Sequence, residues 1–406
     1  MKTKQRAALL ASFTILAGAL ITGCGSSPKP QGEIPQGAVV LDEEPQVASY
    51  LRTWALGSDQ AEMAQGVRWQ AEQIHGEYLK EIIIAFGLID QEDLSTIRFP
   101  DVPEDGSWDL WAEAAKLKEL WPHLKQHLSI GGWGAEFSDT AYDPEIRERF
   151  IAQLCDYLER YDLDGADIDW EYPVGPDWGQ EIKSRPEDRE TYIALLTELR
   201  AALDALGEKT GKRYALSACI PAGTWWIDKN DAVAAVNVVD NLKLMAYDYY
   251  GGWSRTTGHL ANLYTNPADP EGRSTAQIVE AYLAAGVPAE KIVLGLAFYG
   301  RAWGGVEDGG AQGLFQPYAE AAYPDGLSWS KIKAFLQGDE YIRYWDATAQ
   351  APYLYNGDIF ITYTDAEAIR SIAGYVKKTG LAGVMVWEYG HDMEGELFKV
   401  LNESLQ

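Results

Sequence analysis

Cysteine and histidine are scarce in this chain, with three and five residues among 406. His123 and His127 lie four apart but lack the glutamate that follows the first histidine of the zinc-protease pattern, so we expect both to be ordinary helix residues. Cys155 lies in a helical pattern and Cys219 in an apolar strand-like run, and both are expected to be buried free thiols. No Cys/His group has metal-ligand spacing, so neither a metal nor a disulfide is predicted.

Positive charge is also scarce. Lysine and arginine number 34 against 61 aspartates and glutamates, which gives a formal charge of −27. Nucleic acid and anionic membrane surfaces repel so acidic a protein, and neither is expected as a partner. The sequence has no glycine-rich phosphate-binding loop and no Gly-x-Ser-x-Gly motif. These absences argue against cofactors and against serine-hydrolase chemistry.

No hydrophobic run is long enough to span a membrane. The uncharged run from Ala7 to Gly23 follows a basic start and is typical of an export signal. Residues 21–24, Ile-Thr-Gly-Cys, resemble the lipobox of bacterial lipoproteins, which predicts a lipoprotein signal peptide at 1–23 and lipidation of Cys24. The alternative is an ordinary signal peptide with a coincidental cysteine. Residues 24–44 are expected to form a flexible tether. The protein is therefore expected to be exported and anchored to a bacterial membrane through Cys24 only.

Aromatic residues, by contrast, are abundant, with 15 tryptophans and 23 tyrosines. Many lie at the ends of strand-like runs rather than inside helices, where their rings are placed to stack on sugars. A neutral polysaccharide as ligand fits both this distribution and the scarcity of basic residues.

The segment LDGADIDWEYP, Leu163–Pro173, crowds several acids together. Asp167, Asp169 and Glu171 alternate with apolar residues, which is the period of a β-strand, so they form one row on one face. A solvated edge strand is the alternative, but the isoleucine and tryptophan between the acids do not suit it.

Carboxylates about 6–7 Å apart on one face cannot all ionise freely, so we expect at least one raised pKa in this row. Glu171 ends the predicted strand, where barrel and open α/β enzymes place their chemistry. General acid catalysis needs a carboxyl group that stays protonated near neutral pH. Glu171 is therefore the candidate proton donor.

Eight strand-like runs alternate with amphipathic helical segments, which favours a (β/α)8 TIM barrel over a doubly wound sheet. The expected strands lie near 46–54, 81–87, 127–131, 165–171, 214–220, 243–247, 292–298 and 383–387. The catalytic barrel is predicted over 45–400. A small α+β insertion is predicted at 302–364, between the seventh and eighth strands.

The segment DGADIDWEYP resembles the Asp-x-x-Asp-x-Asp-x-Glu signature of glycoside hydrolase family 18, the chitinases. Motifs similar to the family's third, sixth, seventh and eighth strands follow in order: SIGGW (129–133), MAYDYYGGW (245–253), GLAFYGRAW (295–303) and GVMVWEYGHD (383–392). The region after Arg301 is similar to the domain inserted in the deep-cleft chitinases. The resemblance covers residues 45–400.

The resemblance implies hydrolysis of chitin, or of another N-acetylglucosamine-containing polysaccharide, with retention and without an enzymic nucleophile. Glu171 would protonate the glycosidic oxygen while the substrate's own 2-acetamido carbonyl attacks the anomeric carbon. Asp169 would share a proton with Asp167 and then hydrogen-bond the acetamido N–H. Tyr247 would hold the acetamido oxygen, with Asp248 assisting nearby.

The resemblance also implies which residues bind the sugars. Trp387 would lie beneath the −1 sugar, and the other subsites would be lined by Tyr172, Trp133, Trp253, Tyr299 and Arg301. Simpler roles stay open, because Trp133 and Trp253 could be ordinary packing and Arg301 could pair with a surface acid.

Four more residues belong to these motifs. Met245 is expected to line the site as structure rather than to take part in the chemistry. Gly131 and Gly132 are expected to allow a tight turn rather than to contact sugar. Ser129 is placed to hydrogen-bond Asp167.

Three other functions are alternatives to this one. A double displacement with Glu388 as nucleophile is disfavoured, because strand alternation turns Glu388 away if Trp387 faces the barrel interior. A non-catalytic chitin-binding lectin of the same fold would lack a competent acid. An endo-β-N-acetylglucosaminidase acting on glycoprotein glycans or peptidoglycan is the closest competing enzyme. In each case we expect a monomer.

Overall fold

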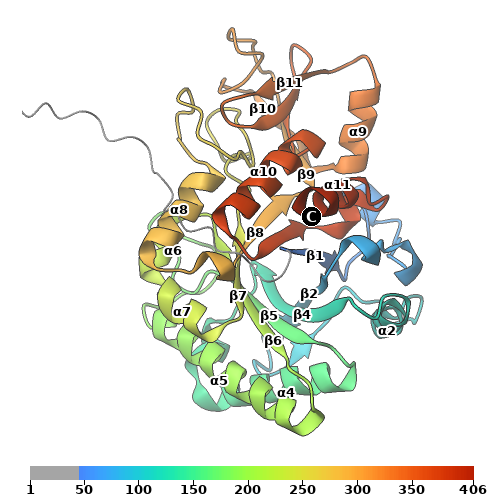
Figure 1. The fold of residues 1–406 in the computed structure, drawn as a ribbon, viewed down its shortest axis with the longest axis vertical. Helices are drawn as coiled ribbons and strands as arrows, with labels where there is room; N and C mark the ends of the chain where they lie inside the picture. Colours follow the sequence, from blue (N-terminus) through green and yellow to red (C-terminus); the bar gives the residue numbers. More distant parts are fainter. Residues whose placement is uncertain (1–44) are drawn as a thin grey trace, which may run out of the picture. The chain divides into compact units, whose positions relative to one another are not determined.

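A closed barrel of parallel strands forms the centre of the computed structural model, which describes residues 45–406. The strand order is β1, β14, β8, β7, β6, β5, β4 and β2, and β2 pairs back to β1 (Figure 1). The bounds are β1 (Gln46–Arg52), β2 (Glu81–Ile89), β4 (Lys125–Trp133), β5 (Gly165–Glu171), β6 (Ala215–Pro221), β7 (Asn241–Met245), β8 (Ile292–Ala297) and β14 (Gly383–Trp387). A short β3 (Ile97–Arg98) pairs antiparallel with β2. The predicted barrel is confirmed, with all eight expected strands present.

The predictions made for the N-terminal segment lie outside the described residues. They are the signal peptide at 1–23, the lipidated Cys24 and the tether at 24–44. Among residues 45–406, no helix is both long and apolar enough to cross a membrane.

Helices follow most of the barrel strands and surround them (Figure 1). They are α1 (Gln60–Met63), α2 (Leu110–Leu120), α3 (Ser138–Tyr142), α4 (Pro144–Arg160), α5 (Asp188–Thr210), α6 (Thr224–Lys229), α7 (Ala232–Val238), α8 (Thr275–Ala285), α10 (Ala366–Thr379) and α11 (Glu396–Leu405). The start of α4 follows from its Asp-Pro pair: Pro144 occupies the first turn, and the side chain of Asp143 accepts hydrogen bonds from the next free backbone N–H groups. Short 3-10 turns lie at Ala71–Gln73, Gly76–Tyr78, Ala289–Lys291 and Tyr389–Asp392.

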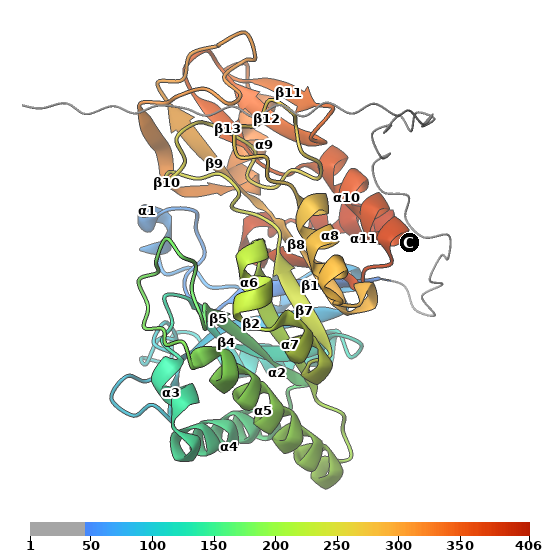
Figure 2. The ribbon, with the colours of Figure 1, turned by 90° about the vertical axis from the view of Figure 1, so that its left-hand side faces the viewer.

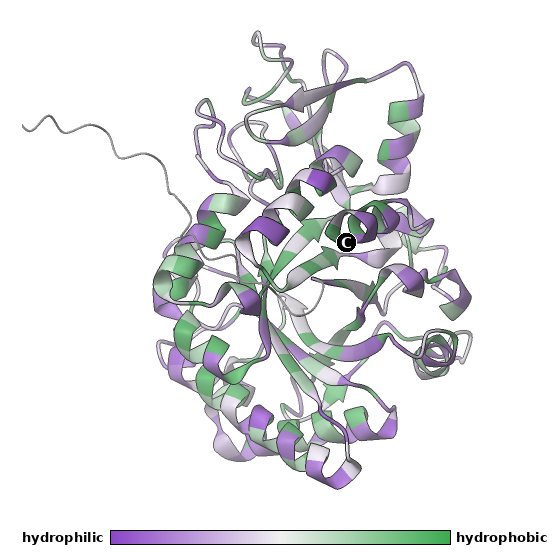
Figure 3. Ribbon diagram, in the orientation of Figure 1, coloured by the Kyte–Doolittle hydropathy of each residue, from purple (hydrophilic) through white to green (hydrophobic). Residues whose placement is uncertain are grey.

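The main core lies between the barrel and its helices. Strand β5 shows how the sequence makes it: Ala166, Ile168 and Trp170 are at most 2% exposed and belong to the same cluster as Leu154 of α4 and Leu195 of α5. Figure 3 shows green, apolar stretches along the barrel strands, while the helices alternate apolar and hydrophilic segments. Because strand residues alternate in direction, the acids of β5 are left on the interior face.

An antiparallel sheet is inserted between β8 and β14. Its order is β10, β9, β13, β12 and β11, with bounds β9 (Tyr299–Gly304), β10 (Glu320–Ser328), β11 (Ile342–Asp346), β12 (Ala351–Tyr355) and β13 (Phe360–Thr362), and it includes helix α9 (Trp329–Gln337). Both views place these strands together at the top of the picture (Figures 1 and 2). The sheet begins at Tyr299, so Tyr299 and Arg301 stand on its first strand.

The insertion is fixed to the loop that follows β7. The backbone N–H of Leu260 donates to Oγ1 of Thr362 (3.0 Å), and the buried imidazole of His259 lies 3.1 Å from the carboxylate of Asp346. These contacts join β13 and β11 to that loop, and β9 pairs with β13.

Candidate active site

Strand β5 carries its acids on one face, as predicted, and that face is the barrel interior. Asp167 and Asp169 are 0% and 4% exposed, whereas Glu171 at the carboxyl end is half-buried. The register with β4 places Trp133 beside Glu171. The row therefore runs from the barrel centre to its open end, where a substrate can reach Glu171.

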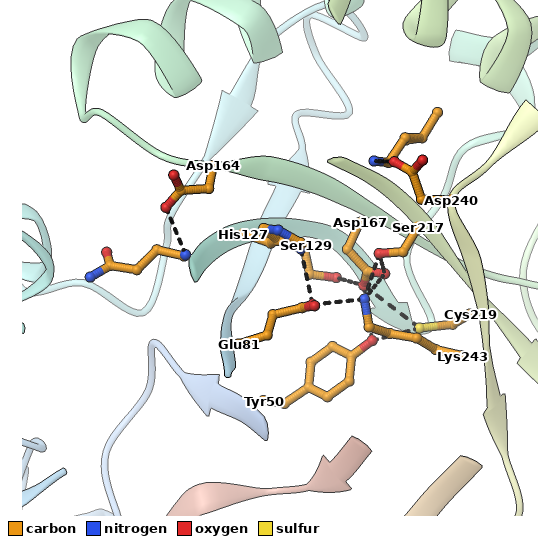
Figure 4. A network of polar contacts seen from close by, with 12 residues as sticks. Tyr50, Glu81, His127, Ser129, Asp164, Asp167, Ser217, Cys219, Asp240 and Lys243 are labelled. Atoms are coloured by element: carbon orange, nitrogen blue, oxygen red, sulfur yellow. Dashed lines mark hydrogen bonds and ion pairs between the residues drawn. The ribbon is translucent and has the colours of Figure 1, made fainter. Parts of the chain in front are cut away.

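Asp167 is held by side chains from four other strands. It accepts hydrogen bonds from the hydroxyls of Tyr50 on β1 (2.9 Å) and Ser129 on β4 (2.7 Å). It also accepts one from Ser217 on β6 (2.6 Å), and the Nζ atom of Lys243 on β7 lies 3.4 Å away (Figure 4). The predicted contact with Ser129 is confirmed, and Asp167 is fixed in place.

Asp169 has fewer partners. Its Oδ1 atom is buried and makes no hydrogen bond within residues 45–406. Burial, together with the charges of Glu171 and Asp167, raises the pKa of Asp169 well above its usual value. Both oxygens of Asp167 already accept hydrogen bonds, so the sharing of a proton between the two aspartates stays a prediction.

Glu171 has the proton affinity that a general acid needs. Burial raises the pKa of Glu171 to about 7; the hydroxyl of Tyr172 opposes the rise and the charge of Asp248 adds to it. The raised pKa expected in the row is confirmed, but removal from water is its main cause and repulsion along the strand is not. A carboxyl group of this affinity can give up a proton and take one back near neutral pH.

Met245 ends β7, which is separated from β5 only by β6, and Tyr247 follows it in the chain. The ring of Tyr247 lies against that of Tyr299, with centroids 6.2 Å apart. Burial raises the pKa of Tyr247 well above its usual value, so its hydroxyl keeps its proton and can donate a hydrogen bond. Met245 joins the interior cluster that contains Cys219 and Trp387, which agrees with its expected structural role.

Arg301 reaches across from the insertion to Asp248. Its Nε and Nη2 atoms donate to the two oxygens of Asp248 at 2.7 and 2.8 Å, and the hydroxyl of Tyr299 donates to the same carboxylate at 2.8 Å. The guanidinium also lies 4.8 Å from the ring centroid of Trp253. Arg301 is thus paired with a predicted site residue and not with an unrelated surface acid.

An aromatic layer surrounds Trp387, which is half-buried. Phe86 stacks on it with centroids 5.6 Å apart, and the ring of Tyr50 lies at 5.4 Å. Trp54 stacks on Phe86 in turn at 6.3 Å. The sequence predictions missed Trp54 and Phe86, although each stands at or near the end of a predicted strand. An aromatic residue at the end of a predicted barrel strand was therefore the signal that could have identified them.

Three further tryptophans lie on the surface. Trp133 and Trp253 are 74% and 62% exposed, so they are not packing residues. Trp178, which the sequence predictions missed, is 77% exposed and meets Trp225 edge to face at 5.9 Å. Trp225 contacts Tyr172 in the same manner at 5.2 Å. Exposed rings of this kind provide flat apolar faces for a carbohydrate.

Gly131 and Gly132 have the backbone role that was expected of them. Their φ angles are +123° and +91°. A Cβ on Gly131 would lie 2.0 Å from the carbonyl oxygen of Asp169, and one on Gly132 would lie 2.6 Å from the ring of Phe86. Only glycine allows β4 to approach the acidic row and the aromatic layer this closely.

The family model described as "Glycosyl hydrolases family 18" matches residues 46–392. The chain belongs to glycoside hydrolase family 18. It is 36% identical over 307 residues to "Chitinase A1" of Niallia circulans, an alignment that covers 71% of this chain and 44% of that protein. The chain spans about half the length of several curated relatives that it matches.

Solved structures agree with this assignment. A family 18 N-acetylglucosaminidase from Paenibacillus barengoltzii aligns with a TM-score of 0.76 and 33% identity, over 89% of this chain and 99% of that chain. Chitinase ChiW from Paenibacillus sp. str. FPU-7 aligns with a TM-score of 0.76 and 36% identity, over 89% of this chain and 42% of that chain.

Glu388 is unsuited to act as a nucleophile in this family member. Its carboxylate is buried, ion-paired with Arg52, and accepts a hydrogen bond from the backbone N–H of Gly390 (2.9 Å). Although burial opposes it, the charges of Arg52 and His391 lower the pKa of Glu388. The structure therefore supports discounting a double displacement through Glu388.

The expectation that His123 and His127 are helix residues is wrong. Helix α2 ends at Leu120, and Pro122 lies two residues further along the chain. Because the residue before a proline disfavours helical geometry, the helix cannot continue, and His123 lies in a turn. His127 belongs to β4, where it is buried with Nδ1 2.9 Å from Oε1 of Glu81. The strand predicted at 127–131 is therefore the correct assignment for His127.

The cysteines match their prediction in part. Cys155 and Cys219 are both free, and Cys219 is buried, but Cys155 is only half-buried on α4. Within residues 45–406, no cluster of three or more His, Cys, Asp or Glu side chains has the arrangement of a metal site.

Proposed function

We propose that this protein hydrolyses the β-1,4 linkages of chitin and chitooligosaccharides with retention of configuration. The observation that carries the proposal is the pair formed by Glu171, half-buried at the open end of β5 with a pKa of about 7, and the buried Asp169 below it. The named chitinase relatives support the same substrate.

Glu171 serves as the general acid and then as the general base. In the first step its proton passes to the glycosidic oxygen as the bond to the anomeric carbon breaks. The carbonyl oxygen of the substrate's 2-acetamido group bonds to that carbon and closes an oxazolinium ring. In the second step the Glu171 carboxylate takes a proton from water, whose oxygen bonds to the anomeric carbon and reopens the ring.

The neighbouring residues steady the acetamido group during these steps. Asp169, whose Oδ1 atom lacks a partner, is placed to hydrogen-bond the acetamido N–H as positive charge develops there. Tyr247 keeps its proton and donates to the acetamido oxygen. Trp387, stacked on Phe86, provides the apolar surface beneath the reacting sugar.

Hydrolysis of chitin hexamer tests the proposal, with a high-mannose glycopeptide as the competing substrate. We expect cleavage of the hexamer and none of the glycopeptide. Glu171→Gln is expected to bind the hexamer without cleaving it, which separates an enzyme from a lectin. A substrate analogue with a 2-hydroxyl in place of the acetamido group is expected to resist cleavage, and its rapid hydrolysis would refute participation of the acetamido group.

Release of single N-acetylglucosamine units from chain ends is a second candidate activity. The similarity to an N-acetylglucosaminidase of nearly the same length favours it. The first products from the hexamer distinguish the two activities, since end-release gives monosaccharide and pentamer whereas internal cleavage gives dimers to tetramers.

We also propose that the protein is exported and held on a bacterial membrane by a lipid on Cys24. The Ile-Thr-Gly-Cys sequence after an uncharged run supports this. Cys24→Ser is expected to move the protein from the membrane fraction to the soluble fraction of the producing cells. An unchanged distribution would contradict the anchor.

A further inference from the structure

A second set of charged groups lies in the barrel interior beneath the acidic row, and the mechanism above does not use it. The Nζ atom of Lys243 lies 2.9 Å from Oε1 of Glu81, which in turn lies 2.9 Å from Nδ1 of His127 (Figure 4). Lys243 is 0% exposed, and Glu81 and His127 are each 4% exposed. We call these three residues the interior triad.

The triad is joined to the acidic row through Lys243. Its Nζ atom donates to Oγ of Ser217 (2.5 Å) and to Oδ1 of Asp167 (3.4 Å). Ser217 itself donates to the same oxygen of Asp167. The ammonium group therefore lies between two carboxylates, one in the triad and one at the base of the row.

Strand geometry places Lys243 on the face that carries the proposed substrate contacts. Lys243, Met245 and Tyr247 follow one another at intervals of two residues, as Asp167, Asp169 and Glu171 do on β5. Lys243 is thus at the bottom of one interior column and Asp167 at the bottom of the other. The charge of Lys243 therefore acts on the residues above it in both columns, Asp169 among them.

Stability does not account for such an arrangement. Burying an ammonium and a carboxylate costs several kcal/mol for each ion, and apolar residues of similar size are often as stabilising as the pair. The neighbouring interior positions Ile83, Val293 and Met385 show that this part of the barrel accepts apolar side chains. The ion pair is better explained by an effect on the acids above it.

We propose that Lys243, oriented by Glu81, is a positioning residue whose buried charge at the base of the acidic row favours the ionised form of Asp169. This inference deepens the proposed function and rests on it for its catalytic meaning.

Titratable groups from five barrel strands lie around Lys243: Tyr50 on β1, Glu81 on β2, His127 on β4, Asp167 and Asp169 on β5, and Cys219 on β6. The charge of Lys243 favours the ionised form of Asp169, although burial and the neighbouring acids outweigh it. Removing the positive charge of Lys243 should therefore raise the proton affinity of the acidic row. Removing the negative charge of Glu81 should lower it.

Three variants of the full chain test the assignment: Lys243→Met, Glu81→Gln and the double variant. The readout is a 13C NMR titration of the carboxyl groups, with Asp169 and Glu171 identified by Asp169→Asn and Glu171→Gln. Lys243→Met is expected to move the midpoint of Asp169 to higher pH by about one pH unit. Glu81→Gln is expected to move it to lower pH, and the double variant to fall between the two.

Opposite movements in the two single variants support the proposal, and an unmoved Asp169 midpoint in both would overturn it. Glu81→Gln leaves Lys243 paired with Asp167, so this variant decides the question if Lys243→Met does not fold. Asp346→Asn is the matched control, because it also breaks a buried pair, with His259, but far along the chain from the row. It should leave the midpoint unchanged. Because the titration needs no substrate, it is independent of the hexamer assay: an inactive wild type refutes the proposed function alone.

Discussion

Arg301 holds Asp248 through two parallel hydrogen bonds, with Nε–Oδ1 and Nη2–Oδ2 distances of 2.7 and 2.8 Å. The pair joins β9 of the insertion to the residue next to Tyr247. Its guanidinium also stacks on the exposed ring of Trp253. One side chain thus links the inserted sheet, the barrel and an aromatic surface.

Arg301→Lys is expected to weaken substrate binding more than it slows the chemistry. Lysine keeps the charge but loses both the two-pronged geometry and the stacking on Trp253. We expect kcat/KM for chitin hexamer to fall about tenfold, mostly through KM, which corresponds to about 1.4 kcal/mol. Arg343→Lys is the control, since Arg343 on β11 pairs with Asp365 and Glu367 at the start of α10. An equal loss in both variants would argue for a general structural effect.

Glu171→Gln is expected to lower kcat on the order of a thousandfold, because glutamine has the shape of the acid without its proton. Affinity for the hexamer, measured by calorimetry, should change little. The wild-type rate should also fall as the pH rises past about 7, where Glu171 loses its proton. Substantial turnover by the variant would mean that another group supplies the proton.

The same substitution is expected to stabilise the fold above neutral pH. The pKa of Glu171 rises from 4.5 to about 7 on folding. The contribution of Glu171 to the free energy of unfolding is therefore complete below pH 4.5 and is lost as the pH rises through 7. Glu171→Gln removes this loss, which amounts to about 3 kcal/mol at most. Urea unfolding should show the variant to be more stable than the wild type at pH 8 and equal to it at pH 4.

Glu388→Gln is expected to change stability in the opposite direction to Glu171→Gln. Its pKa is lowered by the charge of Arg52 despite burial, so ionised Glu388 stabilises the fold above its unfolded pKa. The glutamine variant is expected to be less stable than the wild type at pH 8, because Arg52 is left buried without its partner. A gain in stability for both glutamine variants would show that the two acids do not differ as described.

The exposed tryptophans are expected to matter more for the polymer than for short oligomers. Trp178→Ala and Trp133→Ala each remove a ring that is more than 70% exposed. A stacking loss of about 0.5–1.5 kcal/mol corresponds to weakening of chitin binding by a few-fold to about tenfold. Leu120→Ala, which removes a 45% exposed apolar side chain at the end of α2, should have no effect on pull-down with insoluble chitin.

The fold and the acidic row could be predicted because both depend on local periodicity. Residues 165–171 alternate apolar and acidic side chains, and β5 has those bounds. The predicted strand at 127–131 contains His127, as β4 does in the structure, whereas the helix expectation for the same residue rested on its four-residue spacing from His123 and was wrong. Helix and strand cannot be separated by that spacing alone.

The groups around the row could not be predicted in the same manner. Lys243 meets Glu81 because β7 and β2 face each other across a closed barrel, and nothing in either strand's sequence indicates that partner. The pKa of Glu171 depends chiefly on burial by residues distant in sequence. Phe86 and Trp54 form part of the aromatic layer only because β1 and β2 lie beside β14 or one another.

Barrel closure has a consequence for biosynthesis. Tyr50, which holds Asp167, stands on β1, and Trp387 stands on its direct neighbour β14, with ring centroids 5.4 Å apart. These residues are separated by nearly all of the described chain, so a nascent polypeptide emerging from the ribosome has its acids long before it has the surface on which a sugar would rest. The site would be complete only when β14, the last barrel strand, pairs with β1.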